Sequence, residues 1–339
     1  MNKKLVVATG YGKPKLTFSR FILDNNIYII FVALFIVASF ISPVFLSFNN
    51  MINILRQQCA YIAIGMGLLM VMVTGNIDLS VTPTAALGSV VLAKVIITMG
   101  MDSGTGVMIG LVVALLACCL VGALNGALVS YLKMPSFVVT LAMGFGVQGL
   151  AYIVPNGASV TIPASTNALT VLTTFGQKSD PWLHIPYQIY LIILVVIILS
   201  LVMKFTSYGR LSLAIGSNEK AAVVAGINSK RYKMIALIIC GFLSGLAGIL
   251  IAVGNGSASP ITSAGDYTMV AIAGTVIGGT NLDGGEGVPF KSVVGILVIG
   301  LIGNIMNLTH VPPYNQMVVR AMLIILAVLL RSVTSKKMI

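Results

Sequence analysis

Charged residues are scarce in this chain of 339 amino acids. They make up 8% of the sequence, against about a quarter in typical soluble domains. Hydrophobic residues make up 58%, and only eight residues are acidic. This deficit excludes an ordinary soluble domain, and no segment is polar enough to form one separately. The composition therefore predicts a protein that crosses a membrane several times.

Cysteine and histidine are also few. The four cysteines lie in apolar runs and show no CxxC spacing, which is typical of buried small side chains rather than of a disulfide framework. Two histidines are too few for a metal cluster, so we expect no metal site. No set of serine, cysteine, histidine and acidic residues indicates a catalytic centre. The sequence accordingly predicts no enzyme.

Nucleotide-binding motifs are missing as well. The stretch GFGVQG at 144–149 matches GxGxxG, but it lies in an apolar run and lacks the βαβ unit of a dinucleotide site. The chain is therefore expected to bind neither ATP nor another cofactor. Its net charge of +12 would suggest nucleic acid in a soluble protein. Here the basic residues lie between apolar runs, as topology determinants do, and we expect no nucleic-acid partner.

Long apolar runs dominate what is present. Helices are the expected spanning elements, because backbone polar groups within lipid must be satisfied inside the segment. We predict an all-α fold, a polytopic membrane helix bundle with about ten transmembrane helices. The predicted spans are 27–46, 58–75, 84–99, 106–130, 136–154, 186–206, 234–254, 266–280, 290–309 and 316–331.

The basic residues predict the orientation of the bundle. If the N-terminus is cytoplasmic, Arg56 and Lys178 fall in outer segments, and Lys94 and Arg320 fall within spans. The other sixteen of the twenty basic residues then lie in inner segments, as the positive-inside rule requires. Both termini are thus expected to be cytoplasmic. The predicted divisions are an N-terminal segment at 1–26, a transmembrane domain at 27–331 and a tail at 332–339.

Uncharged amides within the predicted spans allow two interpretations. A buried amide needs a polar partner in an apolar environment. These side chains therefore either bond neighbouring helices or line a path for a polar, neutral solute, which suits a sugar better than an ion. Glycine pairs with GxxxG spacing favour close helix packing. The amides are Asn125, Gln148, Asn304 and Asn307, and the pairs are Gly122/Gly126, Gly241/Gly245 and Gly274/Gly278.

Two longer loops connect the spans. The outer loop at 155–185 contains STNALTVLTTFG, for which we predict a short amphipathic helix on the outer surface. The inner loop at 207–233 contains GSNEKAAVVAGI (216–227). There Asn218 is a suitable N-cap, and Gly226 is a suitable helix stop. Ala221, Ala222 and Ala225 are expected to form a smooth face that admits side chains of a partner.

Three motifs in order resemble one protein family. They are GNIDLSV (75–81), GSNEKAAVVAGI, and the stretch from Ser244 to Gly287 that ends in GGTNLDGGEG. Together they resemble the permease subunits of bacterial binding-protein-dependent ABC importers of the ribose, galactose and arabinose class. The resemblance extends from about Asn50 to Leu330. Thr82-Pro83 and Glu286 depart from the usual pattern of the family.

The resemblance implies a plasma-membrane subunit that works with several partners. These are a cytoplasmic ABC ATPase that binds the ATP, an extracytoplasmic sugar-binding protein, and a second permease copy or a close paralogue. In such permeases a short helix between spans docks into the ATPase. The residues that carry this coupling loop here are Gly216, Asn218, Glu219, Ala221, Ala222 and Gly226, and the GNIDLSV loop contributes Asp78 and Ser80.

The expected function is import of a monosaccharide through the membrane. The same type of importer with a nucleoside, an autoinducer-like furanose or a polyol as cargo remains an alternative. A secondary carrier that works alone is a second alternative, for which Asp78 and Asp266 are the nearest candidate midplane carboxylates.

Overall fold

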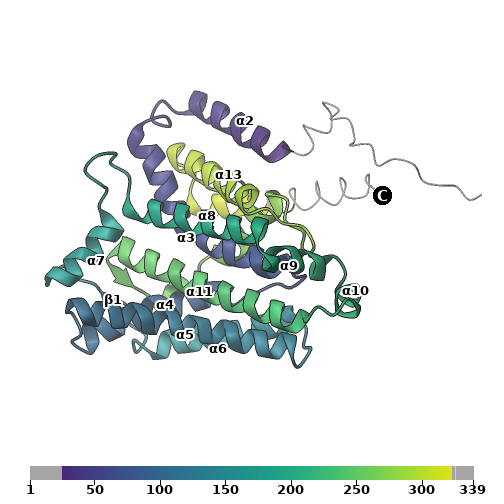
Figure 1. Cartoon of the computed structure of the whole chain (residues 1–339). Helices are drawn as coiled ribbons and strands as arrows, with labels where there is room; N and C mark the ends of the chain where they lie inside the picture. Colours follow the sequence, from purple (N-terminus) through teal and green to yellow (C-terminus); the bar gives the residue numbers. More distant parts are fainter. Residues whose placement is uncertain (1–24, 323–324, 326–339) are drawn as a thin grey trace, which may run out of the picture.

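The computed structural model of the chain describes residues 25–322 and residue 325 (Figure 1). Seven helices are long and apolar enough to cross a membrane, which confirms the prediction of an all-α, polytopic membrane protein. They are α3 (Phe48–Met72), α4 with its π-helical continuation η1 (Val81–Ala93 and Lys94–Thr98), α5 (Gly104–Ser130), α6 (Ser136–Ile153), α8 (Tyr187–Phe205), α11 (Ser229–Asn255) and α13 (Pro289–Leu308).

Shorter elements complete the described chain. They are α2 (Asn26–Ile41), α7 (Asn167–Gln177), α9 (Ser207–Ser217), α10 (Glu219–Val224), the 3-10 helix η2 (Pro260–Ala264), α12 (Tyr267–Ile277) and a helical segment at 313–322. Strand β1 (Val160–Thr161) pairs antiparallel with β2 (Ser257–Ala258). The predicted tail at 332–339, nearly all of the segment 1–26 and the end of the span 316–331 lie outside the described residues.

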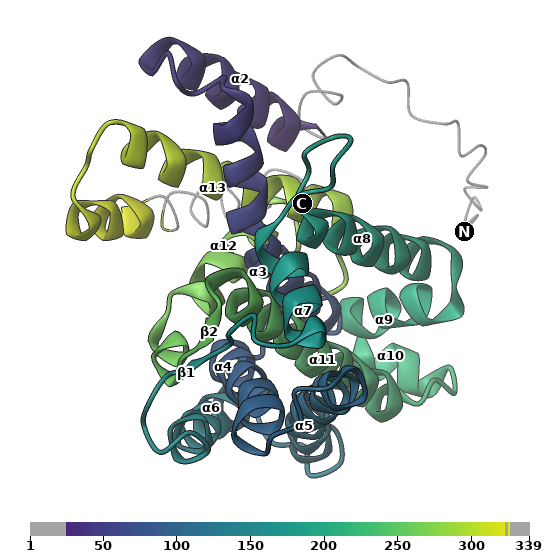
Figure 2. The same cartoon turned by 90° about the vertical axis from the view of Figure 1, so that its left-hand side faces the viewer.

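The centre of the bundle consists of α3, α4 and α11 (Figure 2). Most of the apolar stretch of each is buried, at 78% for α3, 72% for α4 with η1 and 61% for α11. In α6 and α8 the share falls to 28%. Their outer faces carry large apolar side chains, such as Phe145 and Ile197. A lipid environment accommodates such faces, since a helix in lipid does not need a polar side.

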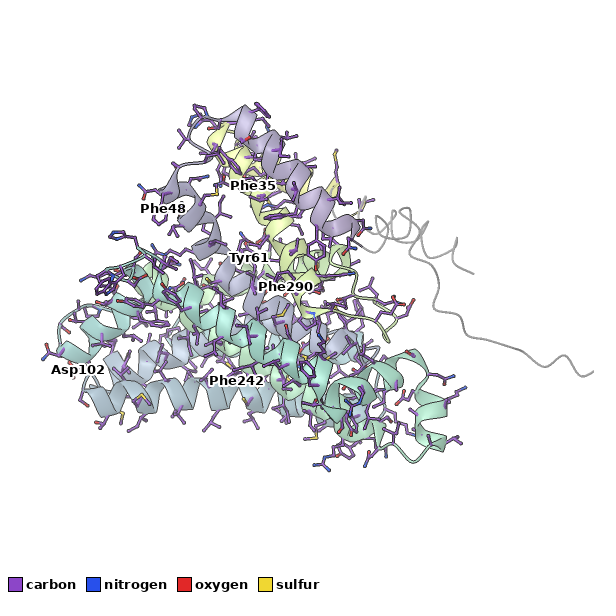
Figure 3. All side chains as sticks on the ribbon, turned by 45° about the horizontal axis from the view of Figure 1, so that its top comes forward. Phe35, Phe48, Tyr61, Asp102, Phe242 and Phe290 are labelled. Carbon is purple, nitrogen blue, oxygen red and sulfur yellow. The ribbon has the colours of Figure 1, made fainter. Side chains whose placement is uncertain are left out.

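Helix α2 lies to one side of this centre and packs on α13 and the start of α3 (Figures 1 and 3). Phe35 of α2 meets Phe45 edge to face, with ring centroids 5.2 Å apart. Ile27 and Ala38 are buried in the same contact region. The first span therefore belongs to the α13 side of the molecule.

Glycines bring helix backbones into direct contact, as their GxxxG spacing predicted. A Cβ atom on Gly122 of α5 would lie about 3.0 Å from the Ile238 backbone of α11, and one on Gly241 would lie 3.1 Å from Gly122. On α12, Gly274 and Gly278 approach the backbone of α13 in the same way, at Ile296 and Ser292. The packing role of these three pairs is confirmed.

Two predicted spans differ from the structure. The second was expected to begin at residue 58, but α3 begins at Phe48, after Ser47 accepts a hydrogen bond from the Asn50 N–H at 3.3 Å. Its first three turns are rich in amide side chains, and their low hydropathy kept these turns out of the predicted span. Arg56 therefore lies within a helix and not in a loop.

The eighth predicted span, 266–280, contains a helix of only 11 residues, α12. At 1.5 Å per residue α12 is about 16 Å long, roughly half of a hydrocarbon core. Its first residue, Tyr267, stacks on Tyr61 in the middle of α3, whereas Thr275 bonds Met72 at the end of α3. Helix α12 thus runs beside the second half of α3 only, and the rest of this crossing is the irregular segment 256–266.

The amphipathic helix predicted in the loop 155–185 is present as α7. Thr166 caps it by accepting a hydrogen bond from the Leu169 N–H. Leu169 and Leu172 are buried against the bundle, while Val171 is 70% exposed. Helix α7 marks one end of the bundle and α10 marks the other (Figure 1). These are called the α7 end and the α10 end below.

Candidate functional site

The stretch GSNEKAAVVAGI forms the end of α9, the short helix α10 and a turn. Asn218 caps α10, because its side-chain oxygen accepts a hydrogen bond from the Ala221 N–H at 3.0 Å. After α10, Gly226 adopts a φ of +83°, which glycine tolerates and other residues rarely adopt. The local sequence therefore fixes both ends of this six-residue helix, as predicted.

An ion pair ties α10 to the following helix. Lys233 of α11 donates to Glu219 across 2.7 Å. Partial burial alone would raise the pKa of the Glu219 carboxyl, but hydrogen bonds from Lys233 and Ser229 and nearby lysine charges outweigh it, so the pKa is lowered. Glu219 thus stays ionised at neutral pH and holds α10 against α11.

The exposed surface of α10 differs from the smooth alanine face that the sequence predicted. Ala222 is only 5% exposed, so its methyl group packs against its own chain. Ala221 and Ala225 are exposed, and beside them Val223 and Val224 are 52% and 89% exposed. A partner would therefore meet Val223 and Val224 rather than Ala222.

Behind α10, the three motifs of the sequence meet at one junction. The Gly285 N–H donates to the Val73 carbonyl at 3.1 Å. Gly216 lies so close to both of these groups that no Cβ atom fits on it. Gly284 in turn lies against Gly75 and Gly216, with a φ of +95°. The loops that follow α3 and α12 and the last turn of α9 are thus joined mainly by backbone contacts, and we name this contact the glycine junction.

A buried polar cluster lies between the glycine junction and the middle of the bundle. One oxygen of Asp78 accepts hydrogen bonds from the N–H and the hydroxyl of Ser80, at 2.8 and 2.6 Å. Asn125 of α5 donates to the same hydroxyl at 2.9 Å. Asp78 and Asn125 are 2% and 0% exposed. The cluster therefore fixes the GNIDLSV loop against α5.

The other amides singled out from the sequence lie elsewhere. Asn304 of α13 exchanges two hydrogen bonds with Asn50 of α3, at 2.8 and 3.1 Å. Asn307 accepts from Gln316 at 2.9 Å. Gln148 lies on α6 and is half-buried. These bonds support the interpretation that Asn125, Asn304 and Asn307 join neighbouring helices, and the four amides do not share one cavity in this conformation.

The unusual Thr82 also has a structural role. Its hydroxyl oxygen accepts a hydrogen bond from the Thr268 N–H at 2.9 Å, and the two hydroxyls lie 2.6 Å apart. These bonds therefore join the first turns of α4 and α12.

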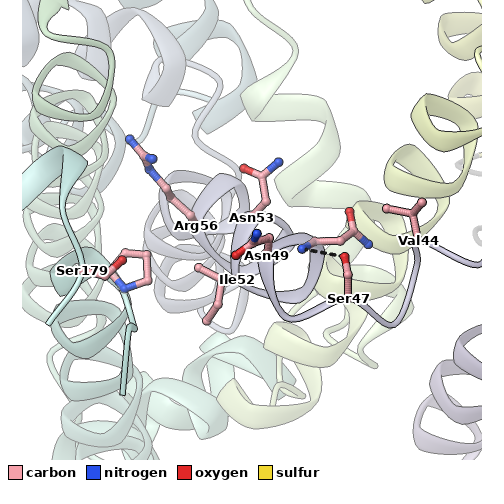
Figure 4. A pocket seen from close by; sticks show the side chains of 9 residues that line it. Val44, Ser47, Asn49, Ile52, Asn53, Arg56 and Ser179 are labelled. Atoms are coloured by element: carbon pink, nitrogen blue, oxygen red, sulfur yellow. Dashed lines mark hydrogen bonds between the residues drawn. The ribbon is translucent and has the colours of Figure 1, made fainter. Parts of the chain in front are cut away.

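Sequence reasoning missed the polar groups at the α7 end. Two neighbouring cavities, of about 370 and 360 Å³, lie along the first half of α3 and share Asn53 and Arg56. Figure 4 shows the first of them. Nearby, Asp266 accepts hydrogen bonds from Tyr61 and from Arg320, one of the two basic residues that fall within the predicted spans. The available signal was the amide-rich run NNMINILRQQ at 49–58.

Comparison with known proteins agrees with the motifs. A family model described as the permease component of the branched-chain amino acid transport system matches residues 50–328. The chain is 32% identical to the ribose import permease protein RbsC of Haemophilus influenzae, over 91% of this chain and 93% of that protein. It is 34% identical to the L-arabinose transport system permease protein AraH of Escherichia coli, over 96% and 95%.

The ribose import permease protein RbsC of Bacillus subtilis is 35% identical, over 88% of this chain and 89% of that protein. No solved structure matches. The relatives are permease subunits rather than enzymes, and the apolar helices agree with a multi-pass protein of the bacterial plasma membrane. The chain therefore belongs to the family of permease subunits of bacterial ABC sugar importers.

Proposed function

We propose that this chain is the membrane subunit of an ATP-driven importer that carries a monosaccharide. An extracytoplasmic binding protein delivers the sugar, a cytoplasmic ATPase drives the cycle, and a second permease copy or a close paralogue completes the pathway. The observation that carries the proposal is the position of α10. This helix exposes Val223 and Val224 and follows the end of α9 that contacts the loops after α3 and α12 at the glycine junction. A movement of the ATPase that displaces α10 would therefore also displace α3, α9 and α12.

The orientation follows from this role. The α10 end faces the cytoplasm, the α7 end faces outward, and both termini are cytoplasmic, with 1–26 and 332–339 as flanking segments. The count of about ten crossings includes α2, the broken α12 crossing and the last helix. The positive-inside distribution of lysine and arginine supports this arrangement.

The orientation is tested by cysteine labelling, with the four native cysteines replaced by alanine. Ser165→Cys on the exposed outer loop should react with an impermeant thiol reagent in intact cells. Lys220→Cys on α10 should react only after the membrane is opened; Ser229 is a poor probe because it is 6% exposed. Reaction of residue 220 from outside would overturn the orientation.

The energy source is tested in proteoliposomes that contain this chain, its ATPase and its loaded binding protein. Uptake of labelled ribose or arabinose should require ATP and should persist when proton and sodium gradients are collapsed. Gradient-driven uptake by this chain alone would establish the secondary-carrier alternative. A wider panel with a nucleoside and a polyol identifies the cargo.

The coupling role of α10 is tested by Val224→Asp. The substitution places a charge on a side chain that is 89% exposed, so the protein should fold normally. ATPase co-purification and transport should both fall strongly. Lys220→Asp, which changes an exposed charge on the same helix, shows whether charge alone matters. Normal transport by Val224→Asp would exclude α10 as the coupling element.

A further inference from the structure

One cavity at the α7 end has the composition of a sugar site. It measures about 360 Å³ and lies between α3, α8, α11 and the first residue of α12. Small-molecule pockets usually measure about 300–1,000 Å³ and combine aromatic side chains with a few polar groups. This volume suits a ligand at the small end of that range. Tyr61 and Tyr267 contribute the aromatic part, with ring centroids 4.6 Å apart.

The polar part consists of amides without internal partners. Asn53 and Gln57 lie one turn apart on α3, and Asn255 ends α11. All three are exposed, and none of their side chains forms a hydrogen bond to another residue that the structure describes. Each amide offers two donor hydrogens and one acceptor oxygen, which is the mixture that sugar hydroxyls require. They contrast with Asn50 and Asn304, which bond each other.

The rim of this cavity is held in place by two further side chains. Arg56 donates from one nitrogen to the carbonyls of Gly176 and Gly254, both at 3.2 Å. Gln188 donates to the same Gly176 carbonyl at 2.8 Å and to Leu250 at 3.3 Å. The ends of α7 and α11 are thus fixed beside α3. The cavity is therefore a built feature of the α7 end and not a gap between loose loops.

The inner side of the cavity coincides with the break in the eighth crossing. Tyr267 is the first residue of the half-length helix α12, and Tyr61 lies in the middle of α3. Transporters commonly place substrate sites near the midplane, beside helices that are interrupted there. The cavity therefore extends from the α7 end to the depth at which a solute passes from the outer to the inner half of the bundle.

We propose that this cavity receives the solute: it binds a neutral, polyhydroxylated molecule of monosaccharide size, with Asn53, Gln57 and Asn255 bonding hydroxyls and the Tyr61–Tyr267 pair supporting the ring. The proposal rests on the function proposed above and assigns the site within it. Single substitutions of these side chains should lower transport without disturbing assembly, because all three amides are exposed and free of internal hydrogen bonds.

Cysteine protection tests the site directly. In the chain with its native cysteines replaced and its partners present, Gln57→Cys and Asn255→Cys are labelled with an impermeant reagent. Ribose, arabinose or galactose, supplied both free and on the binding protein, should slow labelling at both positions several-fold. Ser165→Cys on the outer loop should label at an unchanged rate. If no sugar protects either position, the cavity is not the binding site.

Transport separates this proposal from the proposed function. Gln57→Leu should reduce uptake several-fold at saturating loaded binding protein, with normal ATPase co-purification. Asn49→Leu is the matched control, since Asn49 is an exposed amide two turns away on α3 that does not line this cavity. Normal uptake by Gln57→Leu refutes the site and leaves the importer function intact. Absence of ATP-driven uptake by the unchanged chain refutes the importer function, whatever the labelling shows.

Discussion

The two ends of the bundle are joined in different ways. At the α10 end, three loops meet through glycine backbones, with a Gly285 N–H to Val73 carbonyl bond at the centre. At the α7 end, side chains span the gaps: Arg56 and Gln188 reach carbonyls on α7 and α11, and two cavities lie along the first half of α3. Backbones in direct contact move together, because no flexible side chain lies between them. Helices joined through long side chains are farther apart, which leaves room for a solute.

The largest effect should come from filling the glycine junction. Gly216→Ala places a methyl group against the Val73 carbonyl and the Gly285 N–H, and backbone atoms cannot move aside as a flexible side chain does. We expect a loss of about 3 kcal/mol or more, the upper part of the range for overpacking. Thermal unfolding in detergent and ATPase co-purification should both show it.

Gly226→Ala is the matched control for this junction. No atom lies within 4 Å of the position where its Cβ would be, so only the φ of +83° opposes the change. The expected cost is about 1–2 kcal/mol. If both variants lose stability equally, close packing at Gly216 is not what distinguishes the α10 end.

A smaller effect is expected beside the junction, at Asp78. Asp78→Ala removes the acceptor of the Ser80 N–H and hydroxyl, both buried. An unsatisfied buried group costs about 1–3 kcal/mol, but the substitution also removes the cost of burying a carboxyl group, so the net loss should be below that of Gly216→Ala. Asp78→Asn keeps an oxygen at the same position and should retain most of the stability. Equal melting temperatures for Asp78→Ala and the unchanged chain would show that this cluster does not stabilise the α10 end.

Much of the α10 end could be predicted from the sequence, because its signals are local. An N-cap, an acidic first turn and a terminal glycine specify α10 without any tertiary information. That Ala222 faces inward was not predictable, since six residues give no reliable amphipathic pattern. The meeting of Gly216 with Gly284 was also hidden, because the contact joins positions far apart in the chain.

The α7 end was less predictable for a physical reason. Hydropathy identifies a span by its apolar content, and the first turns of α3 contain amides because they line cavities. The same criterion predicted 266–280 as a full span, whereas the helix there, α12, has only 11 residues. Arg320 was placed within a span, and its bond to Asp266 could not be predicted because the two residues lie far apart in the chain. Polar side chains that line a cavity thus lower the mean hydropathy by which membrane helices are recognised in a sequence.

The smallest effect concerns the loop at 180–185, which connects α7 and α8. The Asp180 carboxylate accepts hydrogen bonds from the N–H groups of Trp182, Leu183 and Ile185 and from the Tyr190 hydroxyl, at 2.7–3.0 Å. These bonds, the one from Leu183 foremost, lower the pKa of Asp180 from 3.8 to about 2. A lowered pKa means that the loop gains stability from the ionised form. That gain is complete above pH 4 and is lost as the pH falls toward 2.

Trp182 reports on this loop, because it is the only tryptophan in the chain and is 89% exposed. Its fluorescence should change between pH 4 and pH 2 as the Asp180 carboxylate takes up a proton. Asp180→Asn carries no charge and should remove this acid transition. Far-ultraviolet circular dichroism must stay constant over the same range, because the helices of the bundle do not depend on Asp180. An acid transition that persists in Asp180→Asn would assign the transition to another group and would show that this carboxylate does not hold the loop.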